Sequence, residues 1–152
     1  RTAADTPRFL HQMAENALHN RPPLGVVRDF VVGKENTLDL KLNGITPFVD
    51  AARIFSLAAG VAHTNTIQRL RLSAPKLNIQ AAEVDAWIDA LLFIQVLRLR
   101  HHCEEGEYES CADMLDNFID PKQLSELDRR ILKEAFRQAR KLQARLAMEY
   151  RL

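Results

Sequence analysis

Residues 38–61, LDLKLNGITPFVDAARIFSLAAGV, decide how this chain folds. The first part belongs to TLDLKL, residues 37–42, where apolar and polar residues alternate as in an extended segment. The second part has apolar residues at helical spacing and lies between Pro47 and Gly60. Proline suits the start of a helix because its missing N–H would have no partner there, and glycine commonly ends one. The stretch therefore predicts a short extended piece followed by a helix, with Thr46 as its cap.

The helical pattern repeats along the rest of the chain. Thr6 and Pro7 form a typical helix start, and the six prolines all fall where one helix would end or the next begin. Helices are expected at residues 7–19, 47–60, 80–105 and 125–150, with a further helical stretch at 108–118 in the linking segment 106–124. A shorter helix is expected between a cap at Thr64 or Asn65 and Pro75. The segment 80–105 is apolar around most of its circumference, which predicts the central helix. We predict an all-α bundle of four to five main helices, with at most a minor extended hairpin near residues 26–42.

Composition sets limits on the class of protein. The 152 residues are 47% hydrophobic and 27% charged, typical of one globular domain, and the net charge of +1 favours neither nucleic acid nor membrane. The longest apolar run, residues 91–99, is interrupted by Gln95 and Arg98 and is too short to span a bilayer. Two cysteines make no disulfide framework, which favours the cytoplasm. The chain lacks an initial methionine, so we expect one helical domain, residues 1–152, cut from a larger protein.

The chain carries no complete catalytic motif: it has no P-loop, no glycine-rich dinucleotide turn and no Gly-x-Ser-x-Gly elbow. His101, His102 and Cys103, with Glu104 and Cys111, have the chemistry of zinc ligands, but their spacing matches no standard site. Adjacent histidines on a helix also point in different directions. We therefore predict no catalytic residue and no metal ligand in this chain.

One half of the final helix is rich in cations: Arg129, Arg130, Lys133, Arg137, Arg140 and Lys141. It could bind phosphate, RNA or an acidic partner, or it could be a solvated face balanced by the acids of residues 104–120. No aromatic side chains interleave with these cations, which argues against stacking on single-stranded nucleic acid. The solvated interpretation is favoured.

Four ordered blocks carry a family resemblance: LDLKLNGITPFVDAARIFSLAAGV, HTNTIQRLRLSA, LLFIQVLRLRHH and LSELDRRILKEAFRQARKLQ. Together they resemble the bacterial putative nucleotidyltransferase substrate-binding domain, over roughly residues 23–142. The family-matching core is thus 23–152, preceded by an N-terminal helix and linker, 1–22. Such domains follow a nucleotidyltransferase domain, in proteins that often carry CBS or cyclic-nucleotide-binding domains. The first block also resembles, more distantly, a Lys-x-x-x-Gly-Gly-Leu-x-Asp-Ile element of protein-PII uridylyltransferases and glutamine synthetase adenylyltransferases. The matching positions are Lys41, Gly44 and Asp50, although Pro47 and the single glycine depart from that element.

The resemblance implies a substrate-binding domain that is inactive alone and acts in signal transduction. The adjoining nucleotidyltransferase domain would contribute Mg²⁺ and the metal-binding acids, with a nucleoside triphosphate as substrate and a protein or small molecule as acceptor. No cofactor is expected in this chain itself. The expected substrate-binding residues are the polar and glycine positions of the matching blocks: Asp39, Lys41, Gly44, Asp50, Arg53, Arg69, Arg71, Arg98, Arg100 and His101. Their cations would bind phosphate or an acidic acceptor, or form salt bridges at the edge of the bundle, as Asp50 and Arg53 would with each other.

Two other classes of function remain open. One is a regulatory interaction or dimerisation module, which would form a homodimer through the last helix or dock on a signalling protein. The other is a helical ribonuclease of the kind paired with minimal nucleotidyltransferases. The arginine–histidine spacing of that class is longer than the spacing from Arg98 to His101 or His102, so we rank it below the others.

Overall fold

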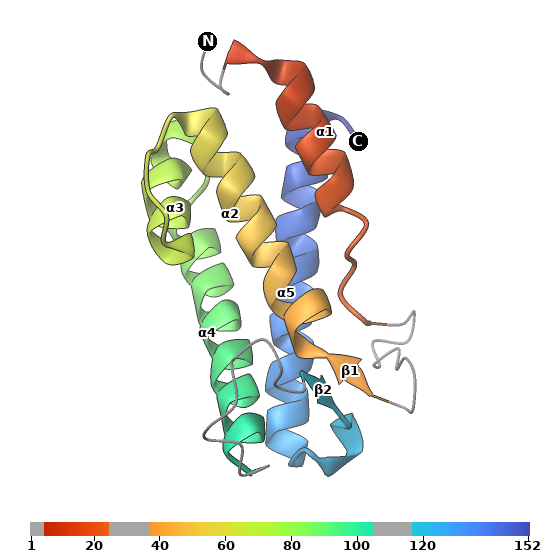
Figure 1. Cartoon of the computed structure of the whole chain (residues 1–152). Helices are drawn as coiled ribbons and strands as arrows, with labels where there is room; N and C mark the ends of the chain where they lie inside the picture. Colours follow the sequence, from red (N-terminus) through yellow and green to blue (C-terminus); the bar gives the residue numbers. More distant parts are fainter. Residues whose placement is uncertain (1–4, 25–36, 105–116) are drawn as a thin grey trace.

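The structure is a computed structural model, and it describes residues 5–24, 37–104 and 117–152. Its helices form a bundle (Figure 1). The main helices are α1 (Pro7–Ala17), α2 (Thr46–Ala59), α3 (Thr66–Ser73), α4 (Ala81–Glu104) and α5 (Glu126–Tyr150). Helix α2 contacts α1, α3 and α5, whereas α4 packs mainly on α5. The prediction of an all-α bundle of four to five main helices is confirmed, with five such helices in the described residues.

The helix ends follow the sequence signals. The side chain of Asn65 accepts a hydrogen bond from the backbone N–H of Gln68 at 3.1 Å, and Ser125 does the same for Asp128 at 3.1 Å. Such caps satisfy N–H groups that have no partner within the helix. Gly60 ends α2 in the left-handed conformation, with φ of 68°. These local signals are enough to explain why the helix boundaries were predictable.

The stretch before α2 differs from its prediction. Only Leu38–Asp39 is a strand (β1), and Leu40–Ile45 forms a π-helix (η3). The Asp39 carboxylate accepts the N–H of Leu42 at 2.9 Å, which bends the chain away from an extended course. Thr46 is not the cap of α2: it lies inside the helix, and its hydroxyl donates to the carbonyl of Lys41 at 2.9 Å. Side-chain hydrogen bonds thus replace the expected extended piece with a wide helical turn.

The partner of β1 comes from far along the chain. Strand β2 (Phe118–Ile119) pairs with β1 in antiparallel register, Leu38 opposite Ile119. The pair of strands is minor, as predicted. Its second strand, however, lies outside the predicted range of residues 26–42. Phe118 also lies outside any helix, which corrects the end of the helical stretch predicted at 108–118. Residues 25–36 and 105–116, where the rest of these two predictions falls, are outside the described part of the chain. Two short 3₁₀-helices, Ala74–Leu77 and Pro121–Gln123, complete the described elements.

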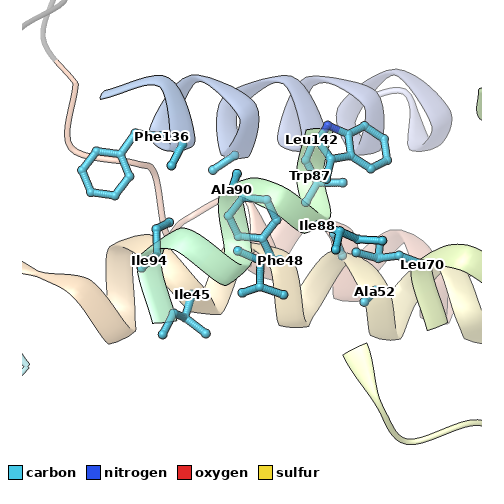
Figure 2. Close-up of a cluster of buried hydrophobic side chains, with 14 of the residues drawn as sticks. Ile45, Phe48, Ala52, Leu70, Trp87, Ile88, Ala90, Ile94, Phe136 and Leu142 are labelled. Atoms are coloured by element: carbon cyan, nitrogen blue, oxygen red, sulfur yellow. The ribbon is translucent and has the colours of Figure 1, made fainter. Parts of the chain in front are cut away.

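The core lies where α2, α4 and α5 meet (Figure 2). Phe55 of α2 and Trp87 of α4 stack with ring centroids 6.5 Å apart, and both are buried. At the other end of the core, a Cβ on Gly44 would lie 3.1 Å from Cγ2 of Ile94 and 3.4 Å from Cε1 of Phe136. The glycine therefore lets η3 approach α4 and α5 closely.

Helix α4 is not the central helix that its apolar composition predicted. It lies at the edge of the bundle (Figure 1), and its Leu92, Val96 and Leu99 are 42%, 51% and 63% exposed. The structure therefore leaves one apolar face of α4 in contact with solvent. Within the described ranges, no helix is both long enough and apolar enough to cross a membrane.

Candidate functional site

The predicted site residues do not form one site. Most of them lie where β1 and η3 meet the C-terminal half of α4, a region that we call the strand end of the bundle: Asp39, Lys41, Gly44, Arg98, Arg100 and His101. Arg69 and Arg71 belong to α3, which lies beside the opposite end of α4 (Figure 1). At about 1.5 Å per residue, α4 is about 36 Å long, so these two arginines are far from the strand end. Asp50 and Arg53 are on α2.

At the strand end, Asp39 and η3 determine where Lys41 lies. Asp39 is half-buried and its carboxylate is occupied by the N–H of Leu42. Lys41 follows in the first turn of η3 and its side chain is exposed. π-Helical turns are uncommon and often occur at functional sites, because the wider turn changes the direction of its side chains. Asp39 therefore fixes the backbone that carries Lys41, and solvent can reach the Lys41 side chain.

Asn117 joins the two halves of the strand end. Its side-chain oxygen accepts a hydrogen bond from Nε of Arg98, and its backbone carbonyl accepts the N–H of Leu40 at 3.0 Å. Sequence reasoning missed Asn117, since no motif surrounds it and its role depends on contacts with distant parts of the chain. Through these two bonds the half-buried Arg98 is held against the start of η3.

Arg100 is the more accessible arginine of α4. Its Nη1 lies 3.3 Å from Oδ2 of Asp128, and the side chains are 49% and 22% exposed. Exposed ion pairs of this kind contribute little to stability. Arg100 can therefore exchange its carboxylate partner for another anion at small cost, as a phosphate-binding residue must.

His101 and His102 lie next to each other on α4, with ring centroids 6.1 Å apart and ring planes tilted by 44°. His102 is buried, His101 is half-buried and Cys103 is exposed. In the described residues, no three His, Cys, Asp or Glu side chains are grouped so that they could hold a metal ion. Cys111 and the side chain of Glu104 lie outside the description.

Gly44 is a packing position. It is buried, and the contacts that a Cβ would make with Ile94 and Phe136 explain the glycine without any ligand. A glycine can mark close approach of the backbone to a ligand or to other side chains. Here the approaching atoms belong to the core.

The remaining predicted residues have separate surroundings. Burial raises the pKa of Asp50, and the nearby Arg53 guanidinium partly opposes that rise. Arg53 itself is exposed. Nε of Arg69 donates to the carbonyl of His63, so it holds the loop before α3, while Arg71 is exposed in the last turn of α3. None of these contacts links α3 to the strand end.

Several cations of α5 are engaged within the chain. Arg130 pairs with Glu126 and Arg137 with Glu134, both at 2.8 Å, and Arg140 donates to the carbonyl of Leu24. The hydrogen bond from Arg137 lowers the pKa of Glu134. These acids lie on α5 itself, not in the preceding acidic segment. The contacts favour the solvated interpretation of this basic face.

Comparison with known protein families gives a match that spans the bundle. A family model described as "putative nucleotidyltransferase substrate binding domain" matches residues 7–150, from the first residue of α1 to the last residue of α5. No curated protein and no solved structure gives a significant match.

Proposed function

The chain belongs to the family of putative nucleotidyltransferase substrate-binding domains, and from this premise we propose that it binds a nucleoside triphosphate or its acceptor for an adjoining nucleotidyltransferase domain. The observation that carries the proposal is the family match over all five main helices. In this proposal the chain is not catalytic by itself. The adjoining domain supplies the metal-binding acids and Mg²⁺, and the reaction is uridylyl or adenylyl transfer.

Within the chain, the strand end is the proposed contact with substrate. The exposed Lys41 and the accessible Arg100 come from different segments, and Asp39 and Asn117 position the backbone and Arg98 around them. Arginine and lysine side chains are suited to phosphate oxygens, since each hydrogen bond is strengthened by charge. The opposite end offers Arg71, which is also exposed but stands on a different helix.

One binding measurement and one labelling reaction test the proposal. The 152-residue chain is titrated with each of the four nucleoside triphosphates, followed by calorimetry or by amide NMR shifts. We expect Lys41→Ala and Arg100→Ala to weaken binding, and the matched variant Arg71→Ala, on α3, to leave it unchanged. In parallel, the longer protein is incubated with Mg²⁺ and labelled nucleotides in lysate. No labelled acceptor with any nucleotide, together with no nucleotide binding by the chain, would overturn the proposal.

One observation favours a second function, that of an interaction module. The exposed Leu92, Val96 and Leu99 give α4 an apolar outer face that the described part of the chain does not cover. This face differs from the last helix, which the sequence indicated as the dimer contact.

A further inference from the structure

Three apolar side chains lie in a line on the solvent side of α4. Leu92, Val96 and Leu99 are separated by four and three residues, and the exposed Cys103 continues the line four residues later. This spacing is that of the seam by which two helices pair in a coiled coil. The opposite side of the same helix, with Ile94 and Leu97, is buried in the bundle. We call the residues Leu92, Val96 and Leu99 the outer stripe.

The charged side chains beside the outer stripe are acidic towards the N-terminus of α4 and basic towards its C-terminus. Its N-terminal side carries the exposed acids Asp85 and Asp89, and its C-terminal side carries Arg100. Asp89 and Arg100 are eleven residues apart, so at 3.6 residues per turn they differ by only about 20° around the axis. They therefore flank the same side of the stripe, one at each end.

We propose that the outer stripe pairs with the outer stripe of a second copy of this chain, with the two α4 helices antiparallel. A two-fold contact must be self-complementary. In the antiparallel arrangement Asp89 lies opposite Arg100 of the partner subunit at two symmetric places, where it can replace Asp128 as the carboxylate partner of that arginine. A parallel pair would instead set the acidic half of one α4 beside the acidic half of the other, with the two copies of Asp89 on opposite flanks of the contact. Charge complementarity thus selects both the partner and its direction.

The size of the face sets the strength of the dimer. A helix about 36 Å long and about 10 Å wide covers only a few hundred Å² per copy, less than the roughly 800 Å² per partner of a standard interface. A groove of about 250 Å³ between α4 and α5, lined by Phe93 and Ile131 among others, adjoins the stripe and adds apolar surface. The pairing should therefore be reversible and depend on concentration.

Sedimentation equilibrium of the 152-residue chain from about 10 µM to about 1 mM tests the inference directly. The wild type should shift from monomer to dimer over this range, whereas Val96→Glu should stay monomeric. Leu72→Glu is the matched control: Leu72 is 47% exposed, close to the 51% of Val96, but lies on α3. It should dimerise like the wild type. Circular dichroism of each variant checks that the helices remain.

Charge reversal tests the direction of pairing. Asp89→Arg or Arg100→Asp alone should weaken the dimer at least several-fold, and the double variant should restore it. A wild type that stays monomeric up to 1 mM, or a Val96→Glu variant that dimerises normally, would overturn the inference. Failure of the double variant to restore pairing would overturn the antiparallel arrangement. The assay contains no nucleotide, so its outcome is independent of the proposed substrate binding.

Discussion

Replacing Gly44 with alanine separates a packing role from a ligand-binding role at this position. The new Cβ would lie 3.1 Å from Cγ2 of Ile94, closer than carbon atoms normally approach, and 3.4 Å from Cε1 of Phe136. Both neighbours are fully buried, so neither can move aside without disturbing the core. Gly44 itself lies in η3, within helical backbone, so alanine adds no strain of the left-handed kind.

The magnitude follows from two opposed effects. Overfilling a packed core typically destabilises by about 1–3 kcal/mol. Alanine in place of glycine recovers up to about 1 kcal/mol, because the unfolded chain loses fewer conformations on folding. The expected net loss for Gly44→Ala is about 1–2 kcal/mol, which corresponds to a melting temperature lower by roughly 2–8 °C for a domain of this size. Urea unfolding followed by circular dichroism measures it.

Gly60 provides the matched control, because backbone conformation and not close packing requires a glycine there. It has φ of 68°, and a Cβ there would meet nothing within 4 Å. Gly60→Ala should cost about 1–2 kcal/mol through the left-handed backbone alone, and Gly60→Asn should cost less, since asparagine tolerates that conformation. At Gly44 the order reverses: asparagine is larger and polar, so it should be worse than alanine.

The packing explanation of Gly44 is tested by the relative stabilities of its alanine and asparagine variants. If Gly44→Ala and Gly44→Asn unfold at the wild-type urea midpoint, the close contacts with Ile94 and Phe136 do not limit this position. If the same variants also lose nucleotide binding, Gly44 contacts substrate, as the sequence resemblance implied.

Three further predictions concern single side chains. Lys41→Ala should change the unfolding free energy by less than about 0.5 kcal/mol, because the side chain is exposed, while weakening nucleotide binding; a large loss of stability would make Lys41 structural. Burial raises the pKa of Asp50 in the folded protein above its ordinary 3.8. Because the unfolded chain then loses this proton more readily, the wild-type protein becomes less stable as pH rises from 3.8 to the raised pKa. Asp50→Asn should therefore gain stability relative to wild type between acid and neutral pH, and an advantage that shrinks with rising pH in urea titrations would contradict this sign. Phe55→Leu should cost on the order of 1–2 kcal/mol and shift the emission of Trp87, the only tryptophan, because the two rings are stacked; an unchanged spectrum would show that the stack is absent in solution.

The candidate site could be predicted only in part. Lys41 was identified from the family resemblance and Arg100 as a cation of a matching block, and the structure leaves both accessible at the strand end. Asn117, which joins α4 to η3, carried no recognisable signal, because its two hydrogen bonds reach residues far away in the sequence. The arginines of α3 were grouped with the others because they are cations of a matching block, and the length of α4 separates them from the strand end.

The sequence by itself determined the helices of this protein and most of their ends. Caps such as Asn65 and Ser125 and the stop at Gly60 act over a few residues, so their physics is contained in the local pattern. Only the tertiary structure decided which apolar face of α4 is buried and which partner β1 finds. Both outcomes depend on contacts between segments far apart in the chain. The presence of an apolar residue in the sequence does not show which segment it packs against. The pattern that predicted a central helix therefore belongs to a helix whose outer stripe is exposed.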